Sequence, residues 1–400
     1  MSFSIKQHSL LRESRRPRAY TVLFPDPASP KGVRCDLAAG MVANVAVGAG
    51  VTVRNDFDDV PIFQRPIFNA TWDAASGRWT DLVAIGDEAF RWHPFRDYRE
   101  VVYRCTPFWY RIVPRSETGP ALVSVADSPL EGYTLAPMFR NGQDYVYRPV
   151  FELAKDSDGL PHSRSGLKPI CDIGTTVVMP LARSYDARAR VESVFDWFSD
   201  SLLQLVEFAT WDLHSLMSGQ KSTYANTGSC IPKLSASSGC LGDGLAMAWR
   251  GKENAWKNTC SFLCDILIQK HIADDGSYTT TICHLPDMQY FDGLINEHYV
   301  EIAPYFSNVV SAQFAVGGFA MKNGVFYPCA EAKEGTAPKA YAYLNSQLAE
   351  KYPIMVGVGG NTMTNMLTSA TPSSPFHWEA VQRMQGRETN FGGRLILDEA

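Results

Sequence analysis

The stretch Trp249–Asp265, WRGKENAWKNTCSFLCD, holds two cysteines four positions apart, two tryptophans and a polar Asn-x-Trp-x-Asn core. The overlapping run TCSFLCDILI, residues 259–268, is apolar and predicts a core strand. On a strand, Cys260 and Cys264 lie about 13 Å apart along one face, too far for both thiolates to bind one ion. We therefore expect buried, metal-free cysteines here. Only a helix or turn at this position would favour a zinc site with Cys283 and His284.

Composition describes an ordinary globular chain. The 400 residues are 45% hydrophobic and 20% charged, with 30 Gly and 24 Pro, and the formal net charge is −5. This length favours two or three domains, and so much Gly and Pro is typical of short strands joined by turns. The negative charge gives no general attraction to nucleic acid or to an anionic membrane surface.

No targeting or membrane segment is expected. The basic N-terminal residues 1–20 are not followed by an apolar region, so they indicate a solvated arm rather than a signal peptide or a nucleic-acid site. The most apolar run, residues 37–53, is interrupted by Asn44 and is shorter than the roughly 20 residues that span a bilayer. Nine cysteines without a short framework indicate reduced, buried thiols, with a Cys230–Cys240 bridge left open.

Two domains are predicted, with a boundary near residues 126–130. From Arg18 to Val125, short β-rich runs alternate with turn signals, which is typical of an all-β sandwich or small barrel. Residues 1–128 are therefore expected to form a β-rich attachment or oligomerisation domain, and residues 129–400 a second domain. In that second domain, apolar residues recur at helical spacing over residues 187–217 and predict one long helix.

The opening stretch resembles the R-G-x-x-N-x-W-G-N-x-x-E-[WF] segment of C-type-lectin-like domains of the formylglycine-generating-enzyme-like form. The helical stretch 202–219 is similar to the long helix of that family. VGVGGNTMTN and TNFGGRLIL are similar to its closing strands, although the usual Trp after the Gly pair is missing. Lys257 and Ser261 also depart from the pattern. The matching residues are Arg250, Gly251, Asn254, Trp256, Asn258, Phe262, Gly359, Gly360, Asn390, Gly392 and Arg394.

The resemblance covers about residues 130–400 and is greatest to domains of bacteriophage tail and tail-fibre proteins. It implies an α+β chain, in which the N-terminal all-β domain precedes a lectin-like domain of mixed short strands and one long helix. Enzymes of this family use a cysteine pair between the Gly-Gly strand and the final Gly-x-Arg. Here no cysteine follows Cys329, so the resemblance implies a protein that is not an enzyme and needs no cofactor.

Ligand contacts are expected in the irregular residues 361–383, which combine aromatic, amide and guanidinium groups. For Trp378, a core position is an equal alternative. The candidate contacts are Asn361, Asn365, Phe376, His377, Trp378, Gln382 and Arg383.

These features predict a bacteriophage virion protein, assembled in the host cytoplasm, that recognises a glycan or protein on the host surface. The expected partners are other virion proteins and further copies of the chain, with a trimer favoured, and neither nucleic acid nor a membrane. A virion decoration protein that braces neighbouring subunits is the alternative. A cell-wall hydrolase is the third, because one sequence cannot single out a catalytic carboxylate pair.

Overall fold

The computed structural model describes residues 18–399 except 95–98, 116–119, 140–141, 172–173, 218, 220–223, 235–237, 243, 257, 292–294, 305–310, 346–353, 360–374 and 384–390. Strands dominate this part of the chain. One sheet has the order β2-β1-β8-β7-β9: Val33–Asp36, Tyr20–Leu23, Leu122–Ala126, Trp109–Val113 and Thr134–Leu135. A second has the order β10-β6-β4-β5: Val146–Pro149, Glu100–Cys105, Ile67–Asp73 and Arg78–Ala84.

Three smaller sheets complete the strand arrangement of the described residues. The sheet β16-β15-β14-β3 contains Lys252–Glu253, Met247–Trp249, Ser238–Cys240 and Ala46–Val47. Two-stranded ladders link β11 (Ala154–Lys155) to β12 (Pro161–His162) and β13 (Ala189–Arg190) to β26 (Ile396–Leu397). Because β3 pairs with β14 in parallel, the N-terminal part of the chain completes a sheet of the later part.

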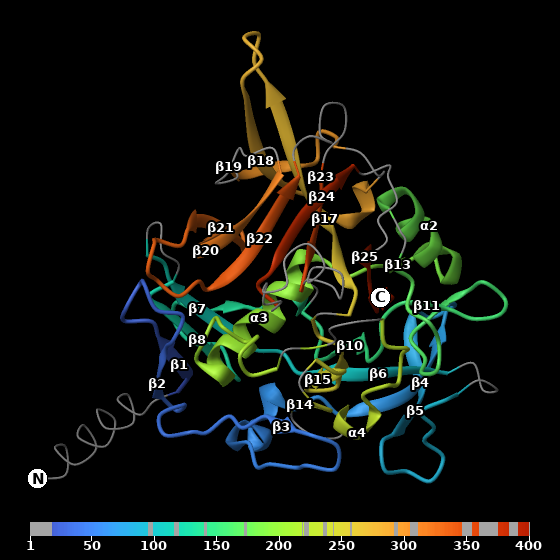
Figure 1. The fold of residues 1–400 in the computed structure, drawn as a ribbon. Helices are drawn as coiled ribbons and strands as arrows, with labels where there is room; N and C mark the ends of the chain where they lie inside the picture. Colours follow the sequence, from blue (N-terminus) through green and yellow to red (C-terminus); the bar gives the residue numbers. More distant parts are fainter. Residues whose placement is uncertain are drawn as a thin grey trace, which may run out of the picture.

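The largest sheet has nine strands within the described residues. Its order is β19-β18-β17-β23-β24-β22-β20-β21, and β25 pairs with β17. Figure 1 shows this sheet in the upper part of the molecule, with the β17–β18 hairpin projecting beyond it. The strands are Val300–Pro304, Tyr278–His284, Cys260–Ile272, Ile354–Val358, Trp378–Arg383, Ala340–Asn345, Ser311–Lys322, Val325–Glu331 and, for β25, Phe391–Gly392.

The described helices are α2 (Thr175–Tyr185), α3 (Val194–Phe208) and the short α4 (Ile231–Leu234). Helix α3 lies between the large sheet and the sheets beneath it, where it contacts β17 and β21 on one side and β1 and β8 on the other (Figure 1). All its residues except Phe195 are buried. A helix enclosed in this way has no solvent-facing side, so each of its polar side chains requires a partner inside the protein.

The predicted long helix over residues 187–217 is wrong at both ends. Ser193 caps α3 through a capping box with Asp196, and residues 189–190 before it pair with β26 instead. Ala209, at φ 51°, takes the left-handed conformation that ends the helix. Apolar spacing continued past both caps, but capping side chains and strand pairing set the limits.

The expected α+β class is also wrong, because the protein is predominantly β. Strands account for 39% and helices for 13%, in many small antiparallel sheets without a closed barrel in the described part of the chain. Most predicted N-terminal strands form, in β1, β5, β6, β7 and β8. Residues 50–55, GVTVRN, are another of the short β-rich runs between Arg18 and Val125, but they form no strand, and the apolar run 37–53 contributes only β3.

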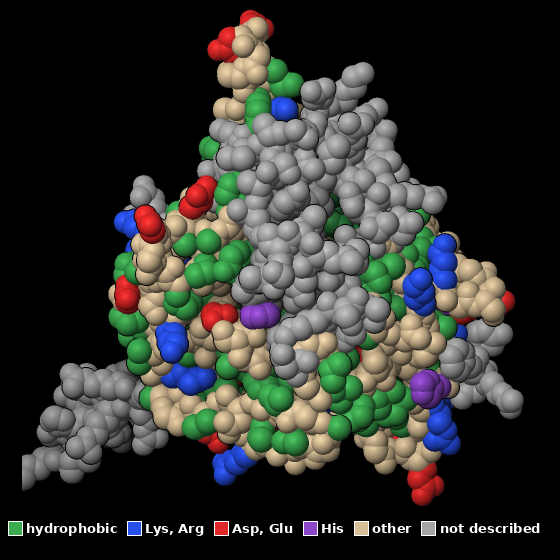
Figure 2. Space-filling model, viewed as in Figure 1, with side chains coloured by type: hydrophobic (Ala, Val, Ile, Leu, Met, Phe, Trp, Pro, Cys, Tyr) green, Lys and Arg blue, Asp and Glu red, His purple; other side chains and the backbone are tan. Residues whose placement is uncertain are grey.

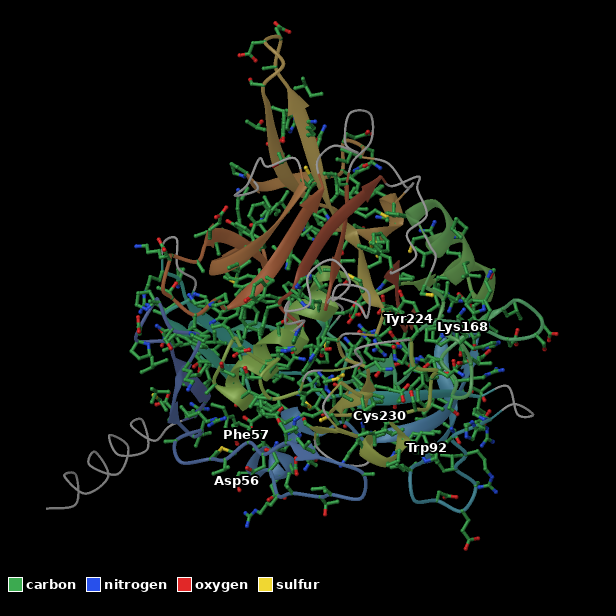
Figure 3. The ribbon with its side chains drawn as sticks, viewed as in Figure 1. Asp56, Phe57, Trp92, Lys168, Tyr224 and Cys230 are labelled. Atoms are coloured by element: carbon green, nitrogen blue, oxygen red, sulfur yellow. The ribbon has the colours of Figure 1, made fainter. Side chains whose placement is uncertain are left out.

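The hydrophobic core is continuous across residues 128 and 129. One cluster of buried side chains extends in sequence from Val22 to Ala380 and includes Phe57, Cys230 and Trp378. Figure 3, in which Phe57 and Cys230 are labelled, shows side chains filling the space between the large sheet and the sheets below. Residues 18–128 therefore share their core with the rest of the chain.

Among the described residues, no helix is both long enough and apolar enough to cross a bilayer. All nine cysteines are free thiols, so the Cys230–Cys240 bridge is not formed. The predicted strand over residues 259–268 is confirmed as β17. Cys260 and Cys264 lie on it, both fully buried.

Candidate functional site

The residues of the opening motif lie inside the protein. Arg250 donates from Nε to Glu207 Oε2 at 2.8 Å and from Nη2 to Glu207 Oε1 at 2.9 Å. The same carboxylate, in the last turn of α3, accepts from Trp249 Nε1 at 2.9 Å and from Asn55 Nδ2 at 2.8 Å. Four donors thus surround one buried carboxylate, which ties the end of α3 to the motif.

A second buried carboxylate, Glu152, organises the rest of the motif. It accepts from Asn254 Nδ2 at 3.3 Å, from the side chain of Asn258 and from the Thr259 backbone N–H at 3.1 Å. Trp256 lies beneath, 1% exposed, and donates to the Met217 carbonyl at 2.9 Å. In an irregular loop these side chains satisfy groups that no strand ladder reaches, so their role is structural.

The closing motif residues complete the same framework. Arg394 donates to the carbonyls of Val150 at 3.1 Å and Asn254 at 3.0 Å. Gly359 has φ +92° and packs against Trp256, and a Cβ on Gly392 would lie 2.5 Å from Thr259 Oγ1. Gly251, at φ +81°, and Phe262, 1% exposed, are likewise inside, whereas Gly360 and Asn390 lie outside the described residues.

Helix α3 carries two further buried carboxylates. Asp196 accepts from Arg148 Nε at 2.9 Å and is paired with Arg190, and Asp200 is paired with Arg65 and with Lys252 Nζ at 3.1 Å. Burial raises the pKa of Asp196, but the two guanidinium groups more than offset this and hold it well below its usual range. These ion pairs fix α3 between the sheets.

Three predicted ligand contacts are buried in the structure. Phe376, His377 and Trp378 are each 0% exposed. The Phe376 ring lies 4.7 Å from that of Trp211, and the Trp378 ring lies 6.0 Å from that of Trp197. Because a fully buried ring presents no surface to a ligand, this burial favours a packing role for the three residues and the core alternative for Trp378.

The side chains of the other four predicted contacts lie outside the described residues. Gln382 and Arg383 are in β24, where their backbones lie opposite Met355 and Ile354. Asn361, Asn365 and the side chains of Gln382 and Arg383 lie outside the described residues.

The two ends of the late segment meet at one end of the large sheet. Val358, at the end of β23, is opposite Trp378, at the start of β24, and Gly359 N–H donates to the His377 carbonyl at 3.0 Å. Trp197 Nε1 donates to the Pro375 carbonyl at 2.8 Å. Strand β22 runs parallel to β24, so its first residues lie at this same end of the sheet.

A cavity of about 190 Å³ opens beside the start of β22. Its polar lining residues are Asp212, His214, Ser215, Lys339 and Tyr341. After α3 the chain buries Trp211, Leu213 and Met217 and leaves Asp212 and His214 half-buried, while the Ser215 N–H donates to Asp212 Oδ1 at 3.3 Å. The alternation of apolar and polar residues in WDLHS was the one signal of this arrangement in the sequence.

Two titratable groups in the cavity have shifted pKa values. Lys339 is buried and donates from Nζ to the carbonyls of Gly317 at 2.8 Å and Pro27 at 3.0 Å. Burial lowers the pKa of Lys339 to about 8. Burial, with a contribution from Asp212, raises the pKa of Tyr341, so its phenol stays protonated near neutral pH and is able to donate a hydrogen bond.

A serine–histidine pair elsewhere has a structural explanation. Ser165 Oγ lies 2.6 Å from His93 Nδ1, but Ser165 is 0% exposed and its hydroxyl also bonds the Trp92 carbonyl. A nucleophile must reach its substrate, so this hydroxyl instead joins two loops in the right-hand half of Figure 3, where Trp92 is labelled. Within the described ranges, no group of three or more His, Cys, Asp or Glu residues is placed to hold a metal ion.

Comparison with protein-family models and with curated proteins found no match for this chain.

Proposed function

We propose that this protein is a component of a bacteriophage tail or tail fibre that recognises a host-cell surface receptor. Recognition takes place at the end of the large sheet where β22 and β24 begin and β23 ends. The sequence resemblance and one feature of this sheet end support this function. Both ends of segment 359–377 are fixed side by side, next to a cavity that carries Asp212, His214 and Tyr341.

The support beneath this sheet end is rigid. Trp211 stacks on Phe319 with ring centroids 5.0 Å apart and contacts Phe376, and the Trp197–Trp378 pair lies beside them. Rigid support reduces the conformational entropy that a binding surface loses when its ligand docks. The buried aromatic residues therefore act indirectly, by positioning the polar side chains that line the cavity.

The chemistry of the cavity suits a polar ligand that is bound without being altered. Asp212 accepts hydrogen bonds, the Tyr341 phenol donates one, and the half-buried Tyr341 ring offers an aromatic surface. Hydroxyl-rich glycans and polar protein loops both present complementary groups. The receptor is accordingly a host surface glycan or protein.

Adsorption to host cells tests the proposal. The variant Asp212→Ala/His214→Ala/Tyr341→Ala removes polar contacts at the sheet end and is expected to abolish adsorption while the protein stays folded. A matched control changes the same residue types, His271, Asp274 and Tyr278, on the β17–β18 hairpin at the opposite end of β17. Normal adsorption by the first variant, or loss confined to the control, contradicts the proposal.

A second candidate function, bracing of neighbouring subunits in the virion, is favoured by exposed apolar side chains near β3. Val42 and Val47 are each 50% exposed and Leu245 is 47% exposed. Figure 2 shows apolar side chains on the lower face of the molecule. If this surface joins subunits, a trimer is the favoured assembly. Val47→Asp/Leu245→Asp is then expected to reduce the mass measured by sedimentation equilibrium without changing adsorption per assembled particle.

A further inference from the structure

A cavity of about 460 Å³ lies where the last turn of α2, strand β13, the loop 286–289 and Asp398 meet. It shares no lining residue with the cavity at the sheet end. Its volume falls within the range typical of small-molecule sites. Its lining combines arginines with methionines, a combination that the proposed receptor surface does not use.

The inner wall of this cavity is a preformed ion-pair network. Arg190 donates to Asp398 from Nε to Oδ2 at 2.6 Å and from Nη2 to Oδ1 at 3.1 Å. Arg190 also pairs with the buried Asp196, and Arg148 lies 3.4 Å from Asp398 Oδ1. Two guanidinium groups and two carboxylates balance one another, so the wall is rigid and carries little net charge.

The rim differs from the wall because one of its guanidinium groups, that of Arg183, is available and that of Arg188 is only partly engaged. Arg183 is exposed and has no hydrogen bond or ion pair to the described part of the chain. The Arg188 side chain is 40% exposed, with Nη2 on the Ala74 carbonyl at 2.6 Å and Nε 3.9 Å from Asp186. Basic side chains are visible on the surface over α2 (Figure 2).

Asp287, an acidic residue on the rim, is engaged by its neighbour Gln289. Asp287 caps the short helix Met288–Tyr290 by accepting from Gln289 N–H at 3.0 Å, and its other oxygen accepts from Gln289 Nε2 at 2.6 Å. An incoming anion therefore meets guanidinium donors on the rim. Met179 and Met288 line the cavity with flexible apolar surface.

We propose that this cavity binds a sugar that bears a carboxylate, such as a hexuronic acid. The planar guanidinium fork matches a carboxylate through paired N–H···O bonds. The methionine side chains pack against the C–H face of the sugar ring, and Gln143 and Gln289 face its hydroxyl groups from the lining. The inference concerns a site separate from the proposed receptor surface and does not rest on that function.

The test uses the full chain and compares glucuronate, glucose and glucose 6-phosphate by saturation-transfer NMR and calorimetry at low salt. Glucuronate is expected to bind, and glucose at least about tenfold more weakly, since a hydrogen bond to a charged group is lost. Arg183→Gln is expected to weaken glucuronate binding by a similar factor. The matched control Arg78→Gln, an exposed arginine on β5, is expected to leave it unchanged.

Equal binding of glucose and glucuronate, preference for the phosphate, or no binding of glucuronate at millimolar concentration overturns the proposal. An equal loss of glucuronate affinity in Arg183→Gln and Arg78→Gln also overturns the proposal, because the loss then reflects the net charge of the protein and not the cavity. The Asp212/His214/Tyr341 variant is expected to bind glucuronate normally. Failure of glucuronate binding is thereby distinguishable from failure of the proposed receptor function in the adsorption experiment.

Discussion

The guanidinium group of Arg250 forms two parallel hydrogen bonds with the carboxylate of Glu207, at 2.8 and 2.9 Å, inside the protein. Arg250 has φ 45°, a backbone conformation that a non-glycine residue adopts only when its surroundings hold it there. The pair connects the end of the central helix α3 to the motif that precedes strand β17. It marks the motif as part of the framework of the fold.

Replacing Arg250 with Met is expected to lower the free energy of unfolding by about 3–5 kcal/mol, because Glu207 is left as a buried charge without its main partner. Urea denaturation measures the change. Arg54→Met is a matched control, since the Arg54 side chain is 83% exposed, and it is expected to have little effect. Equal midpoints for the two variants contradict the assigned role.

Trp256→Ala is expected to lower the free energy of unfolding by about 3–5 kcal/mol, because a buried indole is replaced by a cavity. Trp256→Phe keeps most of the ring but loses the hydrogen bond to the Met217 carbonyl, and is expected to cost less. Thermal unfolding of both variants provides the comparison. An unchanged melting temperature for Trp256→Ala implies that the ring is not part of the core.

Trp378 and Tyr341 lie near the same end of the large sheet but are expected to respond differently. Trp378→Ala removes a fully buried ring and is expected to cost about 3–5 kcal/mol of stability. Tyr341→Ala, at a half-buried position beside the cavity, is expected to cost less than about 1 kcal/mol and to act on adsorption. Chemical denaturation and adsorption assays on both variants distinguish a residue that stabilises the fold from one that contacts the receptor. A larger loss of stability in Tyr341→Ala than in Trp378→Ala contradicts the assignment.

Glu253 makes stability depend on pH. Burial raises its pKa to about 8, although the N–H groups of Cys230 and Gly228 donate to its carboxylate at 2.6 and 2.9 Å. Between its ordinary pKa and about 8, the folded protein binds this proton more strongly than the unfolded chain. The contribution is therefore complete below the ordinary pKa and is lost as the pH rises towards 8.

Glu253→Gln is expected to weaken this fall in stability between pH 5 and 8. The measurement is the free energy of unfolding of the wild type and the variant across that interval, compared as a difference at each pH. A difference that stays constant across the interval contradicts the raised pKa. The comparison isolates Glu253, because the other titratable groups are shared by both proteins.

The sequence predicted individual strands better than their assembly. Runs such as residues 100–105 and 122–126 are recognisable because β-branched and aromatic residues are grouped between turns. Pairing such as β3 with β14, about 190 residues apart in the chain, has no local signal. The extent of α3 was missed because the apolar periodicity ignores the cap at Ser193 and the left-handed Ala209.

The sequence indicated the region of the candidate site but not the residues that form it. Segment 361–383 was singled out for its mixture of aromatic and polar residues, but the aromatic members turn inward onto Trp197 and Trp211. Asp212, His214 and Tyr341 were missed because the cavity joins two distant segments, and neither contains a recognisable motif. Burial depends on tertiary packing, which composition alone does not specify.

The polar contacts around α3 also bear on the order in which the chain can fold during synthesis. Asp196 and Arg190 are made in the middle of the chain, whereas Asp398, which Arg190 binds, and Arg394, which binds the Val150 carbonyl, emerge about two hundred residues later. Until then Arg190 lacks a partner that it has in the folded protein. The network of polar contacts around α3 is thus complete only after residues 394–398 have been synthesised.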